Sequence, residues 1–133
     1  MLTNRTQYRV IYGDTDNMGY AYNANYLRWF EIGRTELFRE VGLTYKTIEE
    51  EGIILPVSEA LCKYVTPARY DDMLTIETTL DKSFKVGMKF DYQIFNEEEK
   101  LVAKGYTKHA CVTKAGKVVR PPKMLKEFIA KHS

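Results

Sequence analysis

The chain has 133 residues, of which 44% are hydrophobic and 29% charged, a composition typical of folded globular proteins and far from that of disordered ones. This length predicts one domain, 1–133, large enough to bury a substantial core. The 20 basic and 18 acidic side chains give a net charge of +2, which excludes the strongly basic surface of a typical nucleic-acid-binding protein.

Two cysteines, Cys62 and Cys111, fall inside strand-like runs without the spacing of a metal or redox motif, so we expect buried free thiols. With only two histidines, a structural zinc site has almost no candidate ligands, and we expect no bound metal. The first residues lack an apolar signal core, and no stretch approaches the ~20 apolar residues of a membrane span. We therefore expect a cytoplasmic protein without a transmembrane segment.

The first predicted element is a strand over residues 7–12, and an acidic loop follows it. From Asn23 to Val41 the apolar spacing changes to three or four residues, which predicts a long helix. Further apolar residues lie off that stripe, so we expect the helix to be buried on several sides. Gly33 inside it predicts the close approach of a strand, and Gly42 stands where a helix commonly ends.

Four strand candidates follow without a helix between them: 53–66, 73–82, 86–96 and 101–113. Pro56 interrupts the first, which predicts a bend or an edge position. Short connections between consecutive strands favour an antiparallel meander. After Pro121 and Pro122, residues 123–132 form a predicted amphipathic helix. The expected fold is therefore α+β, with a five-stranded antiparallel sheet wrapped around a long central helix and a short C-terminal helix.

The acidic loop before the long helix carries the candidate chemistry. Asp14 and Asp16 lie two residues apart, Gly19 follows, and the aromatic-rich run 20–26 enters the helix. This order delivers a carboxylate to a helix N-terminus, where backbone N–H groups lack intrahelical partners and partial positive charge collects. We therefore expect a base and an oxyanion-binding site close together.

Residues 12–26 resemble the active-site signature of the 4-hydroxybenzoyl-CoA thioesterase branch of the hotdog-fold superfamily, close to the Tol-Pal-associated acyl-CoA thioesterases. The likeness continues through residues 70–77 and the later strands. It implies a hotdog fold and hydrolysis of an acyl- or aryl-CoA thioester to the free acid and CoA. Asp16 takes the position of the nucleophile or general base. Asn23 takes the position whose backbone N–H polarises the thioester carbonyl.

The resemblance also implies substrate contacts. Gly19 fits close approach of the backbone to a thioester, although an ordinary turn glycine explains it equally well. Tyr22 is expected nearest the substrate, and Tyr26 belongs to an aromatic cluster that forms either an acyl pocket or plain core. The basic side chains that correspond to the CoA-phosphate contacts of the family are Lys85, Lys89 and Arg120, for which solvated surface charge is the alternative.

The sequence departs from the Tol-Pal-associated branch at Asn23, where those relatives have a histidine. Asparagine cannot titrate, so a mechanism that needs a proton shuttle there is excluded, whereas a backbone donor is preserved. Relatives place the site between two protomers, which implies a homodimer, often paired into a tetramer as a dimer of dimers. No cofactor is implied beyond the coenzyme A of the substrate.

Other interpretations of the loop compete with this one. A calcium site fails because Met18 and Asn25 stand where oxygen ligands are needed. Asp14 and Asp16 could instead only form turns. A hotdog protein that binds acyl thioesters without hydrolysing them stays open, and Asp16 is the residue that discriminates between the two. The hydratase branch needs a catalytic histidine, for which neither His109 nor His132 is suitably placed.

Overall fold

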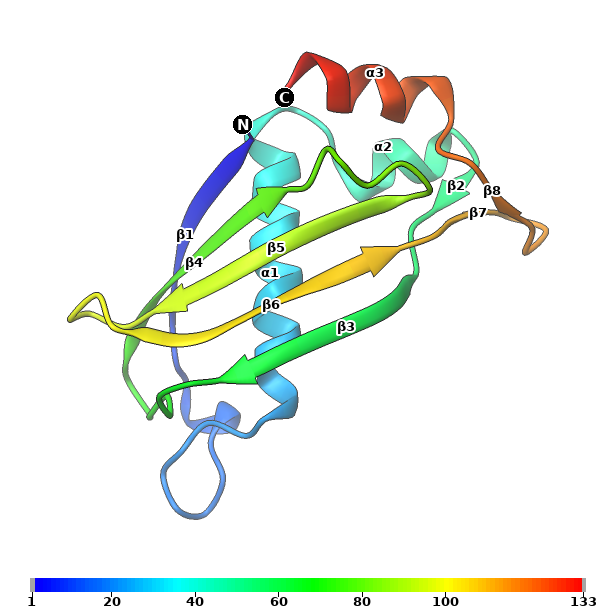
Figure 1. The fold of residues 1–133 in the computed structure, drawn as a ribbon. Helices are drawn as coiled ribbons and strands as arrows, with labels where there is room; N and C mark the ends of the chain where they lie inside the picture. Colours follow the sequence, from blue (N-terminus) through cyan, green and yellow to red (C-terminus); the bar gives the residue numbers. More distant parts are fainter. Residues whose placement is uncertain (1, 133) are drawn as a thin grey trace.

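A computed structural model describes residues 2–132. Its main sheet is antiparallel, has five strands in the order β1-β4-β5-β6-β3, and curves around the long helix α1 (Figure 1). The bounds of these elements are β1 Thr3–Arg9, α1 Ala24–Glu40, β3 Val57–Tyr64, β4 Met73–Leu80, β5 Met88–Phe95 and β6 Leu101–His109. The predicted α+β layout, with five strands around a central helix, is therefore confirmed.

The helix α1 is buried because apolar side chains cover more than one side of it. Trp29, Phe30, Leu37 and Phe38 are almost completely inaccessible to solvent. The ring of Phe30 stacks on Tyr92 of β5 with centroids 4.2 Å apart, an arrangement that adds to the hydrophobic stabilisation of the contact. The predicted burial is therefore confirmed for the off-stripe residues Trp29 and Phe38, but Leu27 is exposed, so one side of α1 faces solvent.

At Gly33 the helix α1 lies against strand β4 of the sheet. A side chain at this position would collide with Thr78 and Ile76 of β4. In β4 and β5 the residues facing α1 alternate with partly exposed ones, as a sheet with one covered face requires. The predicted strand approach at Gly33 is confirmed.

Three details of the sequence prediction are wrong. The first strand covers Thr3–Arg9 rather than residues 7–12, and it ends early because the chain turns into a short 3-10 helix, Tyr12–Asp14. The meander holds only for β4, β5 and β6, since β3 pairs with β6 at the far edge of the sheet. The strand predicted over 101–113 divides at Ala110, whose N–H bonds the carbonyl of Pro56.

The remaining elements are two short helices and a second, smaller sheet. They are α2 Tyr45–Glu50, the strands β2 Ile53–Ile54, β7 Cys111–Thr113 and β8 Val118–Val119 in a second antiparallel sheet, and α3 Lys123–Lys131. Leu125 anchors α3 to the core, as its amphipathic pattern predicted. Cys111 is buried and Cys62 partly buried, and both are free thiols. None of the helices in the described part of the chain has the length and apolarity to cross a membrane.

Candidate active site

The acidic loop between β1 and α1 is a compact hairpin closed by backbone hydrogen bonds. Thr15 and Ala21 form an isolated antiparallel bridge, and the amide of Asp16 donates to the carbonyl of Tyr20 at 2.8 Å. The amide of Ala21 also donates to the carbonyl of Ala68, which fastens the hairpin to the segment before β4. The loop therefore has a defined conformation although much of it faces solvent.

The Asp16 carboxylate lies at the tip of this hairpin and is held by one of its two oxygens. Oδ1 accepts hydrogen bonds from the amides of Met18 at 2.8 Å and Tyr20 at 3.2 Å. Within residues 2–132, Oδ2 makes no hydrogen bond and Asp16 makes no ion pair. Asp16 is thus both a turn-forming residue, as one interpretation predicted, and a fixed carboxylate with one free oxygen.

The start of α1 offers backbone donors next to this carboxylate. Asn23 is the N-cap, and the amides of Asn25 and Tyr26 already donate to the carbonyls of Tyr22 and Asn23 at 3.0 and 3.2 Å. In the described part of the chain, the amides of Asn23 and Ala24 donate no hydrogen bond. These two N–H groups are the unpaired donors that a helix N-terminus provides for a developing negative charge.

One cavity joins the carboxylate to the helix start. It has a volume of about 310 Å³, and its lining consists of Asp16, Tyr20, Ala21, Asn23, Tyr26, Tyr64, Val65, Thr66 and Pro67. The structure therefore brings together three of the residues predicted from the sequence, Asp16, Asn23 and Tyr26.

Tyr26 forms the buried wall of this cavity. Its ring packs against Trp29 with centroids 4.6 Å apart, and its hydroxyl accepts a hydrogen bond from the amide of Ala68 at 3.2 Å. Burial raises the pKa of Tyr26 above its usual value, so the phenol remains neutral at physiological pH. Tyr26 thus supplies an apolar surface and not a titrating group.

Gly19 and Tyr22 are near the cavity but do not line it. Gly19 has a φ of +85° at the hairpin tip, so the turn by itself explains the glycine. Tyr22 is 60% exposed, while its amide donates to the carbonyl of Asp14. Their roles in substrate binding stay predictions.

Tyr64, at the end of β3, is a cavity residue that the sequence analysis missed. Its ring lies edge-on to Tyr26 with centroids 4.9 Å apart, and its hydroxyl donates to the carbonyl of Asn23 at 3.3 Å. No sequence signal links residue 64 to residue 23, because the contact depends on β3 reaching the edge of the sheet beside the helix start.

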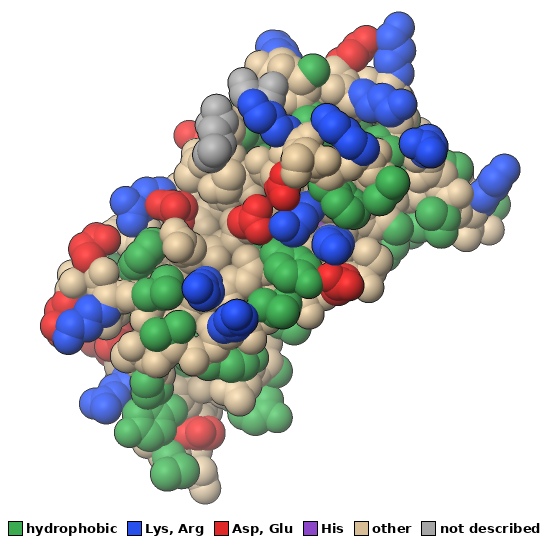
Figure 2. All heavy atoms as spheres, in the orientation of Figure 1, with side chains coloured by type: hydrophobic (Ala, Val, Ile, Leu, Met, Phe, Trp, Pro, Cys, Tyr) green, Lys and Arg blue, Asp and Glu red, His purple; other side chains and the backbone are tan. Residues whose placement is uncertain are grey.

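The three predicted CoA contacts lie at the other end of the molecule. The strand β4 runs from one end to the other, and its eight residues span about 26 Å. Lys85 lines a cavity of about 610 Å³ between the β4–β5 loop and α3, together with Lys82, Phe84 and Lys126. Arg120 is exposed and precedes Pro121 of the same lining. Figure 2 shows basic side chains gathered over this end of the molecule.

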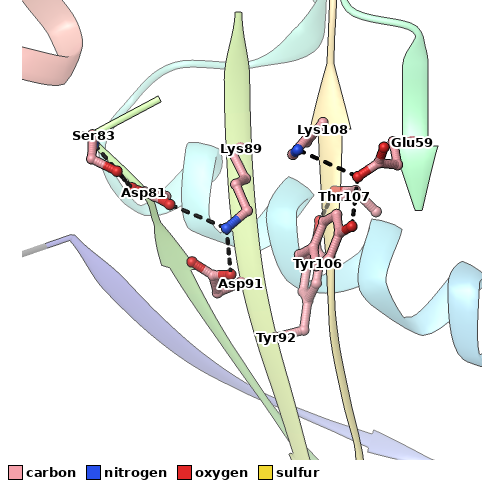
Figure 3. Close-up of polar contacts among 9 residues, drawn as sticks. All are labelled: Glu59, Asp81, Ser83, Lys89, Asp91, Tyr92, Tyr106, Thr107 and Lys108. Carbon is pink, nitrogen blue, oxygen red and sulfur yellow. Dashed lines mark hydrogen bonds and ion pairs between the residues drawn. The ribbon is translucent and has the colours of Figure 1, made fainter. Parts of the chain in front are cut away.

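Lys89 differs from the other two predicted contacts because it is already neutralised. Its ammonium lies 3.2 Å from Asp81 and 3.3 Å from Asp91 on the sheet face opposite α1 (Figure 3). A phosphate there would compete with two carboxylates, so the geometry favours Lys85 over Lys89 as an anion contact. In the described residues, no group of three or more His, Cys, Asp or Glu side chains could hold a metal ion.

The chain matches the thioesterase-like superfamily over residues 10–129, and it belongs to that superfamily. The predicted resemblance to hotdog thioesterases and the prediction of a thioester-hydrolysing enzyme are thereby confirmed.

Individual relatives cover most of the chain. YneP of Bacillus subtilis is 32% identical over 114 residues, which are 86% of this chain and 83% of YneP. The acyl-CoA thioester hydrolase YbgC of Escherichia coli is 33% identical over 104 residues, which are 78% of each chain. The crystal structure of a DHNA-CoA thioesterase from Staphylococcus aureus superposes with a TM-score of 0.84 at 30% identity, covering 90% of this chain and 81% of that one.

Proposed function

We propose that the protein hydrolyses an acyl- or aryl-CoA thioester to the free acid and CoA, with Asp16 and the start of α1 as its catalytic groups. The observation that carries this proposal is the shared cavity: Asp16, whose carboxylate has one free oxygen, and Asn23, whose amide is unpaired, line the same space, and Ala24 with its unpaired amide follows Asn23 in the chain. Two of the relatives are named as an acyl-CoA thioester hydrolase and a DHNA-CoA thioesterase, which supports a CoA thioester as the substrate.

In this mechanism the thioester carbonyl oxygen accepts hydrogen bonds from the helix-start amides. Oδ2 of Asp16 attacks the carbonyl carbon, or takes a proton from a water that does so, and the CoA thiolate leaves. After direct attack, water hydrolyses the resulting anhydride and releases the acid. One preorganised oxyanion donor contributes about 100- to 1000-fold in rate.

The cationic end of the molecule would bind the phosphates of CoA. Lys85 belongs to a cavity whose apolar part, Phe84 and Ile129, suits a nucleotide base, while Lys82 and Lys126 add positive charge. Arg120 lies at its margin.

A homodimer would bring this cationic end close to the Asp16 cavity of the other protomer. β3 is an edge strand with mostly exposed residues, so its free backbone groups can pair with a second copy. A two-fold axis at Leu61 would place Lys63 opposite the partner subunit's Glu59, and the antiparallel pairing would set opposite ends of the protomers side by side. Sedimentation at the monomer mass would contradict the dimer, and sedimentation at four chain masses would indicate a dimer of dimers.

The function is tested by measuring CoA thiol release from a panel of aryl-CoA, short-chain and long-chain acyl-CoA substrates. We expect the wild-type protein to turn over at least one class and Asp16→Asn to hydrolyse the same compound at least about 100-fold more slowly. If the panel binds but none of its members is hydrolysed, the protein is instead a non-catalytic acyl-thioester-binding protein.

A further inference from the structure

Asp14, which the sequence analysis left as a turn residue, is the buried carboxylate of the acidic loop. Its side chain is nearly inaccessible, and within residues 2–132 it forms no ion pair with a cation. Its Oδ2 accepts hydrogen bonds from the Tyr8 hydroxyl at 2.7 Å and from the Ile11 amide at 3.0 Å. A buried carboxylate is costly unless such bonds compensate it, so this one anchors the loop firmly to β1.

The backbone carbonyl of the same residue faces the start of α1. It accepts two hydrogen bonds, from the Tyr22 amide at 2.8 Å and from Nδ2 of Asn25 at 2.7 Å. These two donors flank Asn23 and Ala24, whose amides are the unpaired ones. The Asp14 carbonyl is thus hydrogen-bonded to the chain on both sides of the candidate oxyanion site, and Asp16 follows Asp14 by two residues.

We propose that Asp14 and Asn25 are positioning residues, which fix the separation between the Asp16 carboxylate and the helix-start amides through the Asn25 side-chain bond to the Asp14 carbonyl. This inference rests on the proposed function. Neither residue lines the cavity, so each acts through its neighbours. Because reacting groups must be aligned within fractions of an ångström, loss of this bond should lower the chemical step more than substrate binding.

The Tyr8 hydroxyl on β1, which donates to Asp14, remains protonated at physiological pH. Burial and the neighbouring Asp14 carboxylate raise the pKa of Tyr8 above its usual value. The Tyr8 ring also packs near Trp29 of α1, with centroids 5.8 Å apart. Tyr8 therefore links the loop to α1, because it donates to Asp14 and packs near Trp29 at the same time.

Kinetics of Asn25→Ala and Asn25→Asp test the proposal. Both remove the donor to Asp14, but an aspartate in the first turn of α1 interacts favourably with the helix dipole, so Asn25→Asp should leave helix stability intact. We expect kcat to fall about 10- to 100-fold in both variants with KM nearly unchanged. Asn17→Ala is the matched control, because Asn17 lies in the same loop, is exposed and makes no hydrogen bond with the described residues. Its kcat should equal that of the wild type.

The same substitution in an Asp16→Asn background separates positioning from stability. If Asn25 acts by aligning Asp16, Asn25→Ala should cost little further rate once the carboxylate is gone. An unchanged kcat in both Asn25 variants, or an equal loss with and without Asp16, would overturn the inference while leaving the proposed function standing. Full activity of Asp16→Asn alone would instead refute the proposed function, and this inference with it.

Discussion

The two ends of α1 hold charged groups in opposite ways. At its start, Asp14 and Asp16 are fixed by hydrogen bonds to backbone amides and a tyrosine, and the neighbouring donors are backbone groups. At the far end, Lys82, Lys85 and Lys126 are exposed side chains around an open cavity. The first arrangement suits chemistry, which needs rigid alignment, and the second suits attraction of a flexible anionic group.

This contrast predicts that changes at the helix start alter kcat, whereas changes at the cationic end alter KM. The prediction for the helix start is tested most directly by a substitution that removes a backbone N–H group. Asn23 has a φ of −53°, which proline can adopt, and its amide is unpaired in the described structure. Asn23→Pro should therefore preserve the fold but remove the donor, lowering kcat about 100- to 1000-fold.

Asn23→Ala is the control for that experiment, because it keeps the amide and deletes only the side chain. We expect steady-state kinetics to show near-wild-type turnover for Asn23→Ala. Equal losses in the two variants would move the role from the backbone to the Asn23 amide side chain and contradict the oxyanion assignment.

His109 sharpens the comparison because it is titratable but lies in the core, away from the Asp16 cavity. Its Nε2 lies 2.8 Å from Thr107 Oγ1 and its Nδ1 lies 2.9 Å from the Leu55 carbonyl, and burial lowers its pKa from 6.5 to about 4. The unfolded chain takes up a proton below pH 6.5, whereas the folded chain does so only near pH 4. As the pH decreases from 6.5 to about 4, the free energy of unfolding should therefore fall by up to ~3 kcal/mol.

Denaturant unfolding of the wild type and His109→Gln between pH 7.5 and 4.5 measures this contribution. The variant should show a weaker dependence of the unfolding free energy on pH, and its catalytic pH profile should match that of the wild type. Parallel stability curves would show that His109 is not neutral in the folded state, and a shifted catalytic profile would link it to the reaction.

The smallest expected effect belongs to the cationic end. Exposed charge contacts contribute little each, so Lys85→Ala combined with Lys126→Ala should raise KM for an acyl-CoA only about 3- to 10-fold and leave kcat unchanged. Added salt should reduce the difference from the wild type. Lys89→Ala should leave KM nearly unchanged, because the Lys89 ammonium already forms ion pairs with Asp81 and Asp91. A larger rise in KM for Lys89→Ala than for the double variant would reverse the assignment.

The sequence predicted local features well and long-range ones less well. The spacing of Tyr26, Phe30 and Leu37 predicted α1, and Gly33 predicted the contact with β4, because each depends on neighbours along one element. The place of β3 at the sheet edge was missed, since strand order depends on pairing between residues far apart in the chain.

The candidate site was predictable to a similar extent. Asp16 and Asn23 could be proposed together because one loop carries both. Tyr64 reaches them only through the folded sheet, and the bond from Asn25 to Asp14 gives no periodic signal. The cytoplasmic location, the oligomeric state and the CoA contacts remain predictions.

The most direct test of the account is a single-turnover measurement with Asp16→Asn in excess over a CoA thioester that the wild type hydrolyses. This experiment isolates the chemical step from product release. If the Asp16 carboxylate attacks the thioester or activates water, the rate constant should fall about 100- to 10,000-fold relative to the wild type, while Asn17→Ala stays at the wild-type rate. A wild-type rate constant in Asp16→Asn would contradict the account.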